Sequence, residues 1–243
     1  MDIINKTILI TGGTSGIGLE MVRKLASHNQ IIVISKKGQL TDAQLQNNQS
    51  IELHHADIGD KAALESVVDR IQRDHSKLDV LINNAAIQNT PEFIEDDFNY
   101  DGIESEVNIN FTAICHLTYS CLPLLQASDN GVILNVNSGL AIAPKQGSAI
   151  YCATKSALHS FSTSLRYQLQ KTSIDVKQVF LPLVKTAMTE GRGSGKLKAD
   201  KVAEAIIASI YSNSHTIDIG KVKLLRLINY LVPPLAARIM KAG

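Results

Sequence analysis

Short apolar runs alternate with amphipathic stretches along most of the chain. Runs rich in β-branched residues predict buried strands at residues 6–11, 31–35, 51–54, 79–82, 132–137, 174–181 and 216–219. Helical periodicity falls between and after them, at residues 17–28, 61–75, 104–126, 149–170 and 200–212. Strands that alternate with helices predict an α/β fold: a Rossmann-like, doubly wound parallel β-sheet of about seven strands with helices on both faces.

Three segments add detail to this pattern. The helix expected at 104–126 is apolar on more than one side, which indicates burial, and Pro123 predicts a kink near its end. Residues 39–50 are polar and predict a short helix or a loop. No linker or internal repeat interrupts the chain, so residues 1–243 are expected to form a single domain.

The C-terminal tail, residues 220–243, is basic and apolar, and Pro233 and Pro234 divide it into two short helices. Such a segment suits three roles. It can lie on an anionic membrane surface, complete the wall of an active site, or pack against a partner subunit. The pattern alone leaves all three open, although packing is the simplest.

Composition narrows the class of protein. Hydrophobic residues make up 44% of the chain and the formal net charge is +1, so we expect a large core and no nucleic-acid partner. The chain contains no run of about 18 apolar residues, so we expect no membrane span. The spacing of Cys115, Cys121 and Cys152 suits neither disulfides nor zinc. We therefore expect a cytoplasmic protein without a metal site.

A glycine-rich segment follows the first strand and opens the first helix. It reads Gly12-Gly13-Thr14-Ser15-Gly16-Ile17-Gly18. Glycines permit a tight turn and close approach of a ligand, while the helix N-terminus offers free N–H groups and a positive dipole. The flanking strand and helix favour a phosphate-binding loop over a flexible turn.

The second strand ends in Ser35-Lys36-Lys37-Gly38. In dinucleotide-binding folds the adenosine ribose reaches this point, and an acidic residue there accepts from its 2′-hydroxyl. Here the position has two cations and no carboxylate, which favours a 2′-phosphate and hence NADP, with NAD the less expected cofactor. The alternative is that both lysines are simply solvated.

Tyr151 and Lys155 are four residues apart, so on one helix they share a face. A nearby ammonium favours a phenolate and would draw the tyrosine pKa toward neutrality. Alone, the pair also describes an ordinary surface helix. Polar residues after other strands, including Asp57 and Ser138, should converge on the same edge of the sheet, and this convergence favours a catalytic centre.

These motifs together resemble the short-chain dehydrogenase/reductase family. TGGTSGIG at 11–18 matches its cofactor loop, NNAA at 83–86 resembles its NNAG, and Asn110 stands where the family places a helix asparagine. Ser138 and the YxxxK of Tyr151 and Lys155 complete the set. The likeness spans residues 5–190, and the tail makes the chain similar to bacterial DltE-type oxidoreductases.

The resemblance implies a role for each catalytic position. Tyr151 is the general acid in carbonyl reduction and the base in alcohol oxidation, and Lys155 lowers its pKa and binds the nicotinamide ribose. Ser138 orients the substrate oxygen, and Asn110 helps hold a water of the proton relay. The implied cofactor-binding set is Gly12, Thr14, Ser15, Gly16, Ile17, Gly18, Ser35, Lys36, Lys37, Asp57, Ile58, Asn84, Ala85, Ala86, Tyr151, Lys155, Val184 and Thr186.

Two positions depart from the family pattern. Ala86 replaces the glycine of NNAG, which narrows the room near the cofactor. Leu183 replaces the glycine of the Pro-Gly after the sixth strand, so the path of that loop is uncertain from sequence. The flap, defined here as residues 187–198, is glycine-rich and basic and is expected to be mobile beside the site.

The predicted protein is an NADP-preferring oxidoreductase that transfers a hydride between the nicotinamide and a small carbonyl or alcohol substrate, as a homodimer or homotetramer. Two other functions are compatible with the fold. One is a non-catalytic NADP-binding regulatory or sensor protein, and the other is an epimerase- or dehydratase-like relative. The complete set of Asn110, Ser138, Tyr151 and Lys155 argues against a sensor, which need not keep a proton relay.

Overall fold

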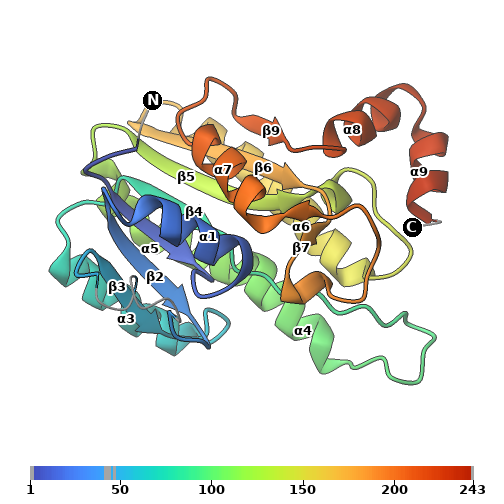
Figure 1. The fold of residues 1–243 in the computed structure, drawn as a ribbon, viewed down its shortest axis with the longest axis horizontal. Helices are drawn as coiled ribbons and strands as arrows, with labels where there is room; N and C mark the ends of the chain where they lie inside the picture. The colour runs from blue at the N-terminus through green and yellow to red at the C-terminus, as the bar shows by residue number, and fades with distance from the viewer. Residues whose placement is uncertain (1–2, 41–44, 46–47, 242–243) are drawn as a thin grey trace.

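The computed structural model describes residues 3–40, 45 and 48–241, so half of the predicted segment 39–50 lies outside the described residues. Seven parallel strands form one sheet in the order β3-β2-β1-β4-β5-β6-β9 (Figure 1). The strands are β1 (Thr7–Thr11), β2 (Gln30–Ser35), β3 (Ile51–His55), β4 (Val80–Asn83), β5 (Gly131–Ser138), β6 (Ile174–Leu181) and β9 (Thr216–Asp218). This confirms the predicted doubly wound α/β fold.

Helices cover both faces of the sheet, and each face has its own core. They are α1 (Gly16–Leu25), α3 (Lys61–Asp74), α4 (Asp101–Val107), α5 (Ala113–Gln126), α6 (Ala149–Leu169), α7 (Ala199–Ser209), α8 (Val222–Leu231) and α9 (Pro233–Lys241). Apolar residues of α1 and α7 pack with one face, and those of α3, α5 and α6 with the other (Figure 1). The strands are therefore buried on both sides, as their continuous apolar runs predict.

The predicted long helix at 104–126 differs in one respect. Helical structure begins at Asp101 and is interrupted by a π-helical turn, Asn108–Thr112, before α5 continues to Gln126. Pro123 lies in the last turn of α5. Periodicity cannot reveal a π-turn, because one extra residue per turn shifts the apolar face only locally.

Buried polar side chains tie β4 and β5 to α6. Asn83 Nδ2 donates to Asn135 Oδ1 at 2.8 Å, and Asn135 Nδ2 donates to Ser162 Oγ of α6 at 2.8 Å. Ser162 Oγ in turn donates to Leu158 O at 2.6 Å. These bonds fix the position of α6 on the sheet more narrowly than apolar contacts alone would.

The tail forms two helices, α8 and α9, that meet at Pro233, as the two prolines predict. They project beyond the sheet at the end of the chain (Figure 1). Across the described ranges, no helix is both long and apolar enough to cross a membrane.

Gly18 sits where α1 approaches the preceding loop most closely. A Cβ on Gly18 would lie 2.1 Å from Gly12 O, inside any allowed contact distance. We expect Gly18→Ala to lower the free energy of unfolding by about 2–3 kcal/mol, because helix and loop must separate. Urea denaturation measures the change.

Gly147→Ala is the matched control for this prediction. Its Cβ would meet nothing closer than Thr90 O at 3.8 Å, and its φ is not in the left-handed region. If both variants unfold at the same urea concentration, close packing at Gly18 is not what stabilises this part of the fold.

Candidate active site

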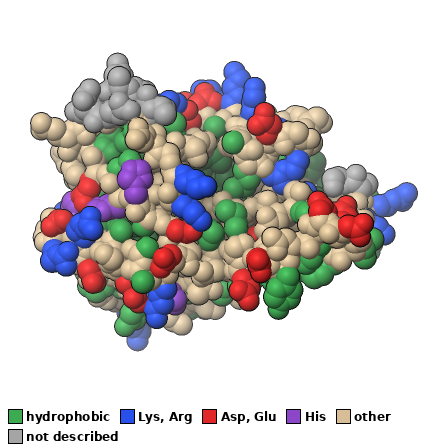
Figure 2. All heavy atoms as spheres, turned by 90° about the horizontal axis from the view of Figure 1, so that it is seen from below, with side chains coloured by type: hydrophobic (Ala, Val, Ile, Leu, Met, Phe, Trp, Pro, Cys, Tyr) green, Lys and Arg blue, Asp and Glu red, His purple; other side chains and the backbone are tan. Residues whose placement is uncertain are grey.

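A cavity of about 940 Å³ lies along the carboxyl edge of the sheet. Apart from Asn110, every residue that the sequence predicts for catalysis or cofactor binding lines it, from Gly12 at one end through Lys36 and Asp57 to Ser138, Tyr151 and Thr186. Seen from below in Figure 2, apolar side chains lie in the middle of the molecular face with Lys and Arg side chains beside them. The structure thus gathers these residues around one space.

The glycine-rich loop has the backbone geometry that the sequence predicts. Gly12 and Gly16 have φ of 70° and 53°, which side-chain-bearing residues rarely adopt. Ser15 is the N-cap of α1, and its side chain makes no capping bond. The N-terminus of α1 therefore lies at the cavity. Its free N–H groups and the positive end of its dipole suit the binding of an anion.

Thr11 holds the two loops of this end together, a function that sequence reasoning missed. Its Oγ1 accepts from the backbone N–H groups of Asn84 and Ala85, each at 3.0 Å. Asn84 Nδ2 donates back to Thr11 O at 2.9 Å. The available signal was the hydroxyl at the last position of an otherwise apolar strand.

The end of β2 is built from polar contacts. Thr14 Oγ1 lies 2.7 Å from Ser35 Oγ and donates to Lys37 O at 2.9 Å. Lys36 Nζ pairs with Asp57 Oδ2 at 2.5 Å, although the Lys36 side chain is 59% exposed. Burial opposes ionisation of Asp57, but the bonds from Lys36 and the Gly59 N–H hold the pKa of Asp57 below its ordinary value.

Lys37 differs from Lys36. It lines the cavity, and no carboxylate pairs with it in the part of the chain that the structure describes. The two lysines are therefore not equivalent: Asp57 already neutralises one of them, and the other keeps its charge for a ligand.

Ser138, the last residue of β5, and Tyr151 of α6 line the same cavity. Ser138 is fixed by its neighbours: its N–H donates to Asn137 Oδ1 at 2.8 Å and its Oγ accepts from Leu140 N at 3.2 Å. Tyr151 is the third residue of α6 and is buried. The catalytic role of this pair stays a prediction.

Lys155 lies one helical turn after Tyr151 and is 3% exposed. Its Nζ donates to Val136 O at 3.0 Å and lies 5.6 Å from the centroid of the Tyr151 ring. Burial lowers the pKa of Lys155 to about 8.

The expectation that the pKa of Tyr151 lies below its usual value is wrong for this structure. Burial raises it to about 12, and the Ser138 side chain only partly opposes that rise. The reason is geometric, because the Lys155 amine is directed at the Val136 carbonyl. Tyr151 is thus a protonated phenol at neutral pH.

Asn110 lies in the π-helical turn and is fully buried. Its Oδ1 accepts from Ile87 N and its Nδ2 donates to Ile87 O, both at 2.9 Å. Nδ2 also donates to Thr154 Oγ1 at 3.3 Å. The Asn110 side chain therefore clamps the loop after β4 to α6.

The structure resolves the path of the loop at Leu183. Among the described residues other than glycine, only Asn5 and Ser148 have positive φ, so Leu183 needs no glycine-like backbone. Space for its side chain comes from Gly193 of the flap, where a Cβ would lie 2.5 Å from Leu183 Cδ2. The short parallel pair β7 (Val184–Lys185) and β8 (Leu197–Lys198) anchors both ends of the flap.

The tail forms one wall of the cavity. This is one of the three roles that the sequence left open for it. Its lining residues are Lys221, Val222, Leu224, Leu225, Ile228, Ile239 and Met240. Leu224 and Ile239 are also exposed on the outside. The far end of the cavity is therefore apolar and is built by α8 and α9.

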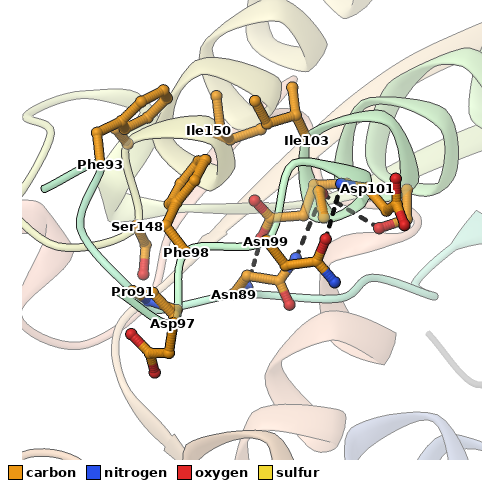
Figure 3. A pocket seen from close by; sticks show the side chains of 14 residues that line it. Asn89, Pro91, Phe93, Asp97, Phe98, Asn99, Asp101, Ile103, Ser148 and Ile150 are labelled. Carbon is orange, nitrogen blue, oxygen red and sulfur yellow. Dashed lines mark hydrogen bonds between the residues drawn. The ribbon is translucent and has the colours of Figure 1, made fainter. Parts of the chain in front are cut away.

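A second cavity, of about 450 Å³, lies between the loop at 89–103 and the start of α6. The rings of Phe93 and Phe98 lie with centroids 4.3 Å apart on its wall (Figure 3). Glu106 lines this cavity and is 2% exposed, and its Oε1 accepts from Asn89 N at 2.6 Å. Burial raises the pKa of Glu106, and this N–H opposes the rise.

Comparison with known proteins places these features in a family context. The family model described as short chain dehydrogenase matches residues 6–196. An oxidoreductase of Bacillus subtilis named DltE, described as uncharacterized, is 36% identical over 194 residues, which cover 78% of this chain and 76% of the relative. A Schizosaccharomyces pombe protein named NADP-dependent 3-hydroxy acid dehydrogenase is 31% identical over 234 residues, which cover 91% of this chain and 86% of the relative.

The fold is also found in solved structures. A short chain dehydrogenase from Burkholderia cenocepacia, in complex with NADP, superposes with a TM-score of 0.87 at 18% identity. The superposition covers 99% of this chain and 100% of that one. At this identity the likeness concerns the fold.

Glu106 gives a pH-dependent prediction. The pKa of Glu106 is higher in the folded protein than in the unfolded chain, so the unfolded chain releases the carboxyl proton at a lower pH. The contribution of Glu106 to the stability of the fold therefore falls as the pH rises past the ordinary carboxyl pKa. Gln cannot lose a proton. We therefore expect the stability of Glu106→Gln to increase relative to that of the parent as the pH rises from about 4 to about 7.

Urea denaturation at both pH values measures this gain. Glu104→Gln, at an exposed position of the same helix, is the matched control and should show no such trend. An equal stability difference between Glu106→Gln and the parent at the two pH values would contradict the assignment.

Proposed function

Because the chain belongs to the short-chain dehydrogenase family, we propose that it transfers a hydride between NADP and the carbonyl or alcohol group of a small molecule. One observation carries the proposal: Ser138 and Tyr151 line the same cavity as the glycine loop, with Lys155 one helical turn after Tyr151. A site of this kind has a proton donor and a dinucleotide cradle in one space.

The residues of the cavity fit a dinucleotide phosphate. Gly12 and Gly16 keep the backbone bare at the start of α1, where a pyrophosphate is stabilised by free N–H groups. Lys37 and Lys36 stand at the end of β2, where a 2′-phosphate is expected. The NADP named for two of the similar proteins supports the same cofactor here.

The nicotinamide, when bound, supplies or accepts the hydride. Tyr151 is protonated at neutral pH and gives its proton to a carbonyl oxygen in reduction. Ser138 donates to the same oxygen and orients it. Lys155, with a pKa of about 8, changes charge close to neutral pH and can pass a proton toward Tyr151.

Assembly and location remain predictions. We expect one domain that forms a homodimer or homotetramer in the cytoplasm. The free thiols of Cys115, Cys121 and Cys152 suit a reducing compartment. Size measurement in solution tests the oligomeric state.

Tyr151→Phe tests the catalytic assignment. Removing one hydroxyl removes the proton donor, and we expect turnover of any carbonyl substrate to fall by at least about a thousandfold. NADPH binding should change little, because the ring remains in place. NADPH oxidation and cofactor fluorescence measure the two quantities.

Tyr167→Phe is the control, since Tyr167 is exposed on the same helix. Unchanged turnover in Tyr151→Phe would refute the role of Tyr151. Loss of NADPH binding together with turnover would instead indicate a structural defect.

Lys37→Ala tests the choice of cofactor. We expect the NADPH dissociation constant to rise about tenfold, because a charge-assisted contact to the 2′-phosphate is lost, while NADH binding stays the same. Lys36→Ala should also favour NADH, since it leaves the Asp57 carboxylate unpaired. The exposed Lys171→Ala serves as the control, and tighter binding of NADH than NADPH to the parent protein would contradict the proposal.

A further inference from the structure

The charges that line the large cavity are almost all positive. The charged lining residues are Asp57 and six cations: Lys36, Lys37, Lys145, Lys155, Arg192 and Lys221. Asp57 is already paired with Lys36. The cavity therefore has an excess of positive charge, although the whole chain is close to neutral.

Only part of this excess is accounted for by the proposed cofactor. Lys36 and Lys37 stand at the expected 2′-phosphate, and Lys155 belongs to the catalytic group. Lys145, Arg192 and Lys221 come from three other segments: the loop before α6, the flap and the start of α8. Within the described ranges, none of these three pairs with a carboxylate.

Arg192 and Lys145 are half-buried. A partly desolvated cation without a counter-ion is unfavourable, and an anion in the cavity would offset that cost. Arg192 Nη2 donates to Met188 O, and the other N–H groups of its guanidinium are left for a ligand. A planar guanidinium binds a carboxylate through two parallel hydrogen bonds.

Both cations act on the catalytic end of α6. Burial raises the pKa of Tyr151, and the charge of Arg192 opposes the rise. Burial also raises the pKa of Cys152, which the backbone and charge of Lys145 oppose. Arg192, Lys145 and Tyr151 all line the same cavity, so one molecule bound there can meet both cations and the Tyr151 hydroxyl.

The remaining wall at this end is apolar. Leu183, Met188, Leu225, Ile228 and Met240 line it, contributed by the loop after β6, the flap, α8 and α9. A small hydrophilic anion would leave these side chains facing water. The wall instead fits a hydrocarbon body attached to the anion.

We propose that the substrate is an apolar oxo acid, whose carboxylate binds Arg192 and Lys145 while its carbonyl meets Tyr151 and Ser138. This rests on the proposed function and names its substrate class. The carbonyl carbon gains a hydride from the reduced dinucleotide and the oxygen gains the Tyr151 proton, so the ketone or aldehyde becomes an alcohol. The carboxylate is unchanged and serves only for recognition.

Equilibrium binding to the NADP-loaded protein tests the anion site without turnover. Octanoate and octan-1-ol are the probes, matched in chain and differing in charge. We expect octanoate to bind at least about tenfold more tightly, and Arg192→Gln to remove that preference. Arg192→Lys should keep part of it, because the charge remains.

Lys196→Gln is the matched control, because Lys196 donates to Thr189 O in the same flap and does not line the cavity. It should keep the preference for octanoate. Equal binding of the two probes to the parent would overturn the proposal, as would a loss in Lys196→Gln as large as in Arg192→Gln.

Turnover supplies the second readout. With a medium-chain oxo acid and its methyl ester, we expect kcat/KM to favour the acid about tenfold or more and Arg192→Gln to abolish the difference. A parent that reduces acid and ester equally would overturn the substrate class. A parent that binds octanoate selectively but reduces no carbonyl would refute the proposed function and still support the anion site.

Discussion

The Lys155 amine enters the interior of the protein and donates to the Val136 carbonyl at 3.0 Å. A buried amine is costly to keep charged, and its pKa of about 8 reflects that cost. The bond joins α6 to the end of β5, so it also sets where Tyr151 stands relative to Ser138. A protonated amine has three donors, and further acceptors at this position, such as ribose hydroxyls, would stabilise its charge.

The same end of the sheet is held by amide side chains. Asn137 Nδ2 donates to Lys155 O and to Gln178 Oε1, each at 3.2 Å, while Asn110 clamps Ile87 from the other side. In a buried network each lost bond leaves a polar group without water. The proposed catalytic residues are therefore positioned by bonds between strands and helix, and a shift of α6 would break several at once.

Strand positions and cavity-lining residues could be predicted from sequence because both follow from local patterns. Continuous apolar runs mark parallel strands, and the residues after each run must meet at one edge. The pKa of Tyr151, the π-turn around Asn110 and the link from Thr11 to Asn84 could not. Each depends on where one atom lies relative to another that is distant in sequence. Lys155 Nζ, for example, donates to Val136 O and not to the phenol of Tyr151.

Charge at the end of β2 shows how such a distant contact changes a sequence argument. Two adjacent lysines suggest two equal phosphate ligands, but Asp57 from beyond β3 pairs with Lys36. A 2′-phosphate there must either share Lys36 with the carboxylate or displace it, and Asp57 repels the phosphate in both cases. In the proposed cofactor site, discrimination between NADP and NAD would thus depend on Lys37, which pairs with no carboxylate among the described residues, while Asp57 would limit how strongly this edge favours the phosphate.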